Sequence, residues 1–88
     1  MNIRAMAWDF RSAEHIARHG VLQQEVEELI EGLYLTRRTR SKCSMVYGRT
    51  YAGRYLVVVI APRSEGYAYV VTARDMTWTE KRWFRRRL

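Results

Sequence analysis

The sequence of 88 residues predicts a single α+β domain, residues 1–88, in which two N-terminal helices pack on a twisted four-stranded antiparallel sheet and a third helix ends the chain. Three observations support this prediction. Apolar residues recur with a helical period up to Gly32 and with a strand period after it. The longest apolar run, residues 55–61, is as long as a strand and too short for a membrane span. A helix-capping sequence starts at Thr77.

The N-terminal third contains a short strand and two helices. Residues 6–8 have the composition of a short strand, and Asp9 is suited to cap a helix that begins at Phe10. Gly20 suits the left-handed conformation that ends many helices. A second helix is expected at residues 23–31, because its apolar residues fall on one side and its glutamates on the other.

Strand-like segments fill the middle of the chain. Four of them are expected to form an antiparallel meander: residues 33–40, 43–50, 54–61 and 67–73. Gly53 suits the left-handed position of a three-residue hairpin turn between the second and the third of these strands. The segment 54–61 is the most apolar, so we expect it in the centre of the sheet with both faces covered.

The last helix is expected to turn Glu80 toward the protein. Thr77 and Glu80 have the spacing of a capping box, and on a helical projection Glu80 falls between Met76 and the pair Trp83-Phe84. A partly buried carboxylate needs a partner, for which Arg74 is suited. Two roles are open for Glu80: it is a general base toward a ribose 2′-hydroxyl, or it closes the capping box and orients an arginine.

The charge distribution indicates an anionic partner. The net charge is +7 and the isoelectric point is near 10.2. Residues 9–31 contain six acids and two bases, whereas residues 33–64 contain seven bases and no acid. Such segregation predicts surfaces of opposite sign, of which the basic one attracts polyanions. The single cysteine, Cys43, and the lack of a signal peptide or membrane span favour a cytoplasmic protein without membrane contact.

Few patterns of known catalytic sites occur in the sequence. It has no glycine-rich phosphate loop, no Ser/His/Asp set and no Cys/His cluster with metal spacing. His15 and His19 share a helical face, but a metal site of this type needs a third or fourth ligand, and the sequence offers none nearby. We therefore expect no metal and no cofactor. Surface or helix-capping roles remain open for both histidines.

Arginines end the strands beside the predicted central one. Arg49 and Arg74 are expected near one end of the sheet, provided that their strands flank the segment 54–61. Converging guanidinium groups suit a phosphate, and they stabilise charge that develops on a phosphoryl group. The alternative is a structural role, in which these arginines extend along the sheet edges or pair with glutamates.

The outward side of the last helix combines an aromatic ring with basic side chains. Trp78 projects there with Arg82, Arg85 and Arg86. A tryptophan among arginines can stack on a base or anchor a protein partner. We expect Trp78, Arg85 and Arg86 to contact a partner.

Six short motifs, in order along the chain, resemble those of the BrnT toxins. They are WD at 8–9, RHGV at 18–21 before an acidic helix, GRT at 48–50, GRYLVVV at 53–59, TAR at 72–74 and TWTEKR at 77–82. Each motif is short, but the ordered set spans nearly the whole chain and is fairly specific. Three positions depart from the BrnT pattern: Arg18 replaces the usual lysine, His15 stands near a common asparagine, and Phe84 replaces a frequent tyrosine.

The resemblance implies a RelE-like fold and a metal-independent endoribonuclease, the toxin of a type II toxin–antitoxin system. The implied partners are RNA and a BrnA-like antitoxin protein, in a complex that can take the form of a heterotetramer bound to operator DNA. The expected reaction is attack of a ribose 2′-oxygen on the adjacent phosphate, which leaves a cyclic phosphate.

The resemblance also carries site residues onto this sequence. The implied catalytic residues are His19, Arg49, Arg74 and Glu80. The residues expected to contact nucleic acid are Arg18, Arg54, Arg63, Lys81 and Arg82. Two alternatives to the ribonuclease remain: a non-catalytic module on the same fold that binds nucleic acid or the antitoxin, and a structural subunit whose arginines contact only a protein.

Overall fold

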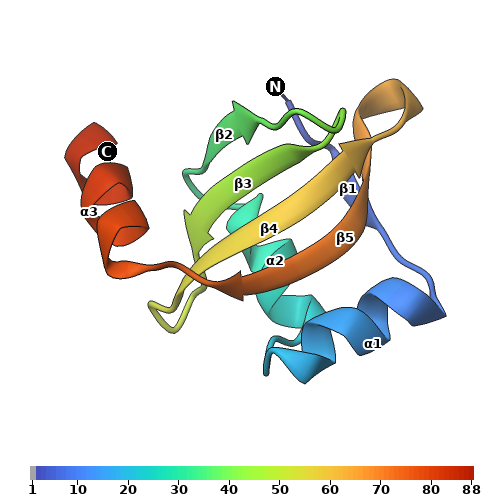
Figure 1. Ribbon diagram of the computed structural model, residues 1–88, viewed down its shortest axis with the longest axis horizontal. Coiled ribbons are helices and arrows are strands. Elements are labelled where there is room, and N and C mark those ends of the chain that lie inside the picture. The colour runs from blue at the N-terminus through green and yellow to red at the C-terminus, as the bar shows by residue number, and fades with distance from the viewer. Residues whose placement is uncertain (1) are drawn as a thin grey trace.

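The structure, a computed structural model, describes residues 2–88 and has the α+β fold predicted from the sequence (Figure 1). Its elements, in chain order, are β1 (Ala5–Ala7), α1 (Phe10–Arg18), α2 (Gln23–Leu29), β2 (Leu35–Arg38), β3 (Ser44–Arg49), β4 (Tyr55–Pro62), the short 3₁₀ turn η1 (Ser64–Gly66), β5 (Tyr67–Asp75) and α3 (Trp78–Arg87). The expected order of strands and helices is therefore confirmed for this part of the chain.

The sheet is mixed and has five strands, in the order β1-β5-β4-β3-β2. The strands β2 to β5 form the expected antiparallel meander, with β4 in the centre. The prediction of a four-stranded antiparallel sheet is nevertheless wrong, because β1 pairs in parallel with the first three residues of β5. A parallel pair between segments about 60 residues apart has no turn between its strands, so local sequence patterns give no sign of it.

Caps at both ends fix the position of α1. The Asp9 carboxylate accepts a hydrogen bond from the amide of Ser12 at 2.8 Å, and the Ser12 hydroxyl accepts one from the amide of Asp9 at 2.9 Å. This reciprocal pair satisfies two amides that the helix leaves free. At the other end Gly20 has a φ of +70°, the left-handed conformation predicted for it.

The main hydrophobic core lies between the sheet and the first two helices. Ile16 of α1 and Val26 and Leu29 of α2 pack with buried side chains of the central strands, among them Leu56 and Val58 of β4. Helix α1 lies beside β5, and α2 crosses beneath β3 and β4 (Figure 1). Burial of these apolar side chains is the main favourable contribution to folding.

A smaller cluster lies on the opposite side of the sheet, where α3 packs. Its buried members are Tyr47, Val57, Met76 and Phe84. Central strand β4 is thus covered on both faces near its start, as predicted, but Val59 further along is only half-buried on this side. Helix α3 therefore covers one end of this face and leaves the rest accessible.

Close packing of α2 on β3 predicts a specific effect of a small substitution. A Cβ atom added at Gly48 would lie 2.9 Å from Cγ of Leu29, so Gly48→Ala should lower the free energy of unfolding by about 1–3 kcal/mol. Urea unfolding followed by circular dichroism measures this change. Gly32→Ala is the matched control, because a Cβ there has no neighbour within 4 Å. Equal stability of the two variants would contradict the close approach.

Candidate nucleic-acid interface

Strand register places three arginines on the side of the sheet that α3 partly covers, which we call the α3 face. One row across the sheet runs through Leu35, Tyr47, Val57 and Arg74, because each is the cross-strand partner of the next. Cross-strand partners share a face.

The neighbouring rows carry the other two arginines. On one side of the first row Arg37 aligns with Met45, Val59 and Thr72, and on the other side Arg49 faces Tyr55. Strands β3 and β5 do flank β4, so the condition set for Arg49 and Arg74 to lie near one end of the sheet is met. Arg37, Arg49 and Arg74 thus point to the same side from β2, β3 and β5.

Arg74 and Glu80 form a bidentate ion pair between the end of β5 and the first turn of α3. The two guanidinium Nη atoms lie 2.7 and 2.9 Å from the two carboxylate oxygens of Glu80. Glu80 also accepts a hydrogen bond from the amide of Thr77 at 2.8 Å, so it closes the predicted capping box as well. The Glu80 side chain is 18% exposed and that of Arg74 is 38% exposed.

The ion pair decides how Glu80 can act. Hydrogen bonds from Arg74 and, to a smaller extent, from Thr77 lower the pKa of Glu80 to about 2 against the effect of burial. A carboxylate with so low a pKa is a weak base near neutral pH. The geometry therefore favours the second role considered for Glu80, which is to orient Arg74.

Four further cations lie over aromatic rings around this pair. The Arg37 and Arg87 guanidinium carbons are 4.1 and 4.7 Å from the centre of the Trp83 ring. The Arg49 guanidinium carbon and the Lys81 ammonium nitrogen are 4.8 and 5.1 Å from the centre of the Tyr55 ring. Trp83 in turn meets Tyr47 edge-on, with centroids 4.9 Å apart. Such contacts hold long basic side chains near the surface in defined positions.

Sequence reasoning missed Arg37, Tyr55, Trp83 and Arg87 as members of this site. Strand alternation would have placed Arg37 on the same side as Leu35, but it does not show which side that is. The stacking of Arg37 and Arg87 on Trp83 joins β2 to α3, and no local pattern shows a contact between segments so far apart.

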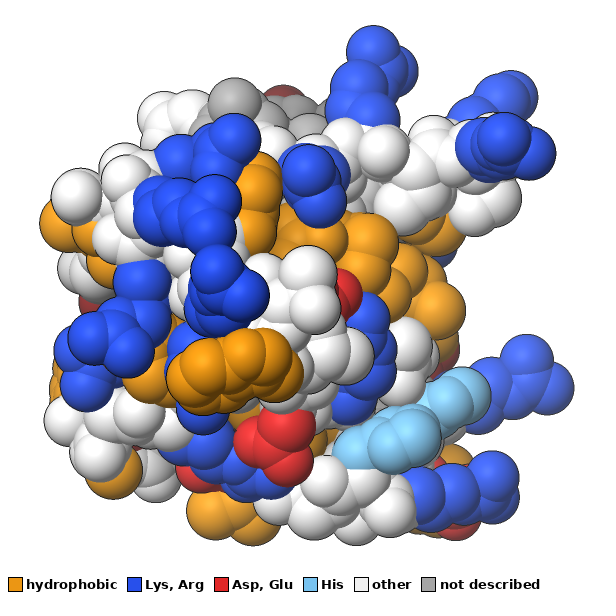
Figure 2. Space-filling view, turned by 60° about the vertical axis from the view of Figure 1, so that its left-hand side comes forward, with side chains coloured by type: hydrophobic (Ala, Val, Ile, Leu, Met, Phe, Trp, Pro, Cys, Tyr) orange, Lys and Arg blue, Asp and Glu red, His pale blue; other side chains and the backbone are white. Residues whose placement is uncertain are grey.

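The α3 face is rich in basic side chains. Figure 2 brings this side of the molecule forward and shows Lys and Arg side chains gathered over it, with few acidic side chains between them. Strands β2, β3 and β4 lie within residues 33–64, which contain no acid, and Glu80 is already paired with Arg74. A surface of this composition attracts phosphate groups.

Other residues expected in the site lie elsewhere. His19 follows the last turn of α1, where its ring stacks on that of His15 with centroids 6.0 Å apart. No hydrogen bond or ion pair within residues 2–88 joins His19 to Arg74 or Glu80. Arg18 pairs with Glu14 at 3.3 Å on the exposed side of α1. Arg63 lies just past the far end of β4, with its guanidinium 5.2 Å from the centre of the Tyr69 ring.

Arg54 has a structural role, although it was expected to contact nucleic acid. Its Nε and Nη2 atoms donate to the Asp75 carboxylate at 2.7 and 3.2 Å. Its Nη1 atom donates to the carbonyl oxygen of Gly20 at 2.8 Å and to Glu25 at 3.0 Å. All three nitrogens are thus engaged, and they tie the turn between α1 and α2 to the ends of β4 and β5.

The far side of α3 carries Trp78, Arg85 and Arg86, which were expected to meet a partner, together with Arg82, which was expected to contact nucleic acid. Trp78 is 69% exposed, and Arg82, Arg85 and Arg86 are exposed as well. Arg82 and Arg86 line a hollow with Thr79 and Trp83. A partner for this surface stays a prediction.

Neither a metal site nor a membrane span is found in the described part of the chain. Residues 2–88 contain no group of three or more His, Cys, Asp or Glu side chains that could hold a metal ion. None of their helices is long and apolar enough to cross a membrane.

Comparison with known proteins leaves the family open. The chain gives no significant match to a protein-family model, to a curated protein or to a solved structure. The resemblance to the BrnT toxins therefore remains a hypothesis.

Stability against acid tests the pairing of Glu80. The pKa of Glu80 falls from 4.5 to about 2 on folding, so its contribution to stability is present above pH 4.5 and is lost as the pH falls toward 2. Glu80→Gln, which keeps the side-chain shape and a capping group, should lower the free energy of unfolding by about 2 kcal/mol at neutral pH, after allowance for solvent screening. Urea unfolding from pH 7 down to about pH 3 should show this difference shrinking.

Glu14→Gln provides the control for that experiment. Both side chains of its ion pair with Arg18 are exposed, and such pairs contribute about 0–1 kcal/mol to the free energy of unfolding. A difference between wild type and Glu80→Gln that does not change with pH would show that the ion pair is not responsible.

Proposed function

We propose that the protein is a metal-independent endoribonuclease toxin of the BrnT kind, which binds RNA on the α3 face. One observation carries the proposal: an arginine oriented by a bidentate carboxylate, Arg74, lies among four cations that are held over Trp83 and Tyr55. The same proposal includes a fold related to that of the RelE-like toxins. In this fold β1 would be a strand added beside the antiparallel strands β2 to β5.

Single-stranded RNA fits the chemistry of this face better than a duplex does. Guanidinium groups bind phosphate oxygens in pairs, and the bases of a single strand can stack on aromatic rings or on arginine planes. Both kinds of group are interleaved here, because Arg37 and Arg87 lie over Trp83 and Arg49 lies over Tyr55. Bases in a duplex are not free to stack in this way.

The reaction would begin with attack of a ribose 2′-oxygen on the adjacent phosphorus. An O–P bond forms, the bond from phosphorus to the 5′-oxygen of the next nucleotide breaks, and the products carry a 2′,3′-cyclic phosphate and a 5′-hydroxyl. The 2′-hydroxyl gives its proton to a base, and the leaving oxygen takes one up. Arg74 and Arg49 would stabilise the negative charge that develops on the phosphoryl oxygens.

Proton transfer is assigned by the resemblance to His19 or Glu80. Arg74 holds the pKa of Glu80 at about 2, which makes Glu80 the weaker candidate. Histidine is the side chain that most often transfers protons in enzymes. His19 would have to approach the α3 face from the end of α1 for this role.

A BrnA-like antitoxin is the protein partner that the same proposal includes. Trp78 with Arg85 and Arg86 presents an exposed ring among positive charges, which suits an acidic, amphipathic segment. As in other type II toxin–antitoxin systems, the toxin and the antitoxin together would then bind operator DNA.

A non-catalytic RNA-binding module is the second candidate, and two observations favour it. Glu80 is fixed in its ion pair, and within residues 2–88 no hydrogen bond or ion pair joins His19 to that pair. Both observations are compatible with phosphate binding on the α3 face. They also mean that neither Glu80 nor His19 is placed there as a strong base.

The test is incubation of the purified protein with a defined, labelled single-stranded RNA in excess chelator. Cleavage that leaves cyclic phosphate ends is expected, and Arg74→Ala should lower its rate by about 10²-fold or more, because one charge-stabilising group is removed. Arg40→Ala is the control, since Arg40 is exposed in the loop between β2 and β3. Circular dichroism checks that both variants fold.

The outcomes separate the candidates. Binding of intact RNA, weakened by Arg74→Ala, would contradict cleavage and support the non-catalytic module. Absence of both binding and cleavage would contradict the two candidates together.

A further inference from the structure

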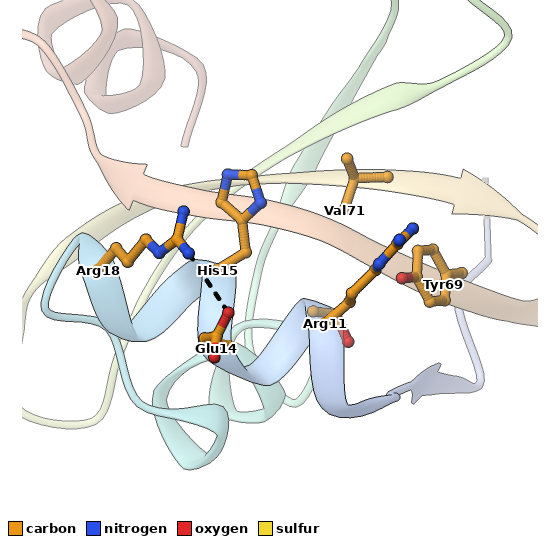
Figure 3. A pocket seen from close by; sticks show the side chains of 7 residues that line it. Arg11, Glu14, His15, Arg18, Tyr69 and Val71 are labelled. Atoms are coloured by element: carbon orange, nitrogen blue, oxygen red, sulfur yellow. Dashed lines mark hydrogen bonds and ion pairs between the residues drawn. The ribbon is translucent and has the colours of Figure 1, made fainter.

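A second basic site lies in a pocket between α1 and β5 (Figure 3). Its volume is about 360 Å³. Arg11, His15 and Arg18 line it from the helix, where spacings of four and three residues put them on one side. Tyr69 and Val71 of β5 form the opposite wall. Pockets that bind small organic molecules begin at about this size.

The strand pairing explains why β5 has room for a pocket here. β1 pairs with β5 only as far as Tyr69, so among residues 2–88 the rest of this edge has no neighbouring strand. The register between β4 and β5 shifts after Val59, and Val71 is left without a partner in β4. Such a bulge turns a side chain away from the regular alternation. Val71 thereby contributes an apolar surface to the pocket.

The acid in the pocket lining, Glu14, and the neighbouring Asp9 are already engaged. Glu14 pairs with Arg18 at 3.3 Å. Asp9 accepts hydrogen bonds from the Tyr69 hydroxyl at 3.0 and 3.1 Å and from the amide of Ser12. Arg11, in contrast, has no ion pair within residues 2–88. It extends toward Tyr69 across the pocket (Figure 3). The unpaired cation therefore lies beside an apolar and aromatic wall.

We propose that this pocket binds a nucleotide, with its phosphate between Arg11 and His15 and its ribose and base against Tyr69 and Val71. Arginine and histidine donate hydrogen bonds to phosphate oxygens, and the wall supplies the apolar contact that a base requires. Free nucleoside monophosphate and a nucleotide unit of an RNA chain share this chemistry. The inference does not depend on cleavage at the α3 face, because Arg74 lies outside the pocket lining.

Titration of the ¹⁵N-labelled protein with uridine monophosphate, followed by amide chemical shifts, tests the site. Saturable shifts are expected for the amides of α1 and of residues 69–71, whereas uridine without a phosphate should cause none at the same concentration. Arg11→Gln should weaken the binding about tenfold, the effect of one charged hydrogen bond. Arg40→Gln removes the same charge from a distant exposed loop and should change the affinity less than about twofold.

Two further probes identify the source of the ligand. A short RNA that shifts the pocket amides where uridine monophosphate does not would make a chain segment the occupant, and the reverse would make it a free nucleotide. Arg74→Ala should leave binding in the pocket unchanged even if it abolishes RNA cleavage. Three results would overturn the proposal. The first is that no phosphate-bearing probe causes saturable shifts, and the second is that Arg11→Gln and Arg40→Gln lower the affinity equally. The third is that the pocket binds an acidic peptide in place of nucleotides.

Discussion

The bidentate pair between Arg74 and Glu80 fixes α3 to the sheet, and the candidate site depends on this link. β5 ends one residue after Arg74, and α3 begins two residues before Glu80, so a short connection is closed by two parallel hydrogen bonds. With α3 held in this way, Phe84 is buried in the small cluster and Trp83 reaches Tyr47. Arg37 from β2 and Arg87 from α3 can then lie over the same ring.

The same pair leaves the surroundings with an excess of positive charge. Glu80 neutralises Arg74 only, whereas Arg37, Arg49, Lys81 and Arg87 are held by aromatic rings. Cations packed so closely repel one another, and a polyanion that crosses the face would relieve that repulsion as it displaces counterions. The structure thus combines an arginine oriented by a carboxylate with four cations held over aromatic rings. This combination suits the recognition of a flexible phosphate chain.

Interactions between neighbours in sequence were predictable, and interactions between distant segments were not. The caps at Asp9 and Thr77 follow from a spacing of three residues, and Arg74 and Glu80 are only six residues apart in the sequence. The parallel pairing of β1 with β5 and the turning of Arg54 toward Asp75 and Glu25 depend on long-range register. Arg54 and Arg74 are both arginines near strand ends, and only the register shows that one tethers the fold while the other reaches the α3 face.

The most direct measurement is the structure of the protein with a short 2′-O-methyl RNA, which cannot undergo attack by its 2′-oxygen. The account predicts phosphate oxygens within hydrogen-bond distance of Arg74 or Arg49, with at least one base stacked near Trp83 or Tyr55 and the Arg74–Glu80 pair intact. RNA bound only over α2, with the α3 face free, would contradict it.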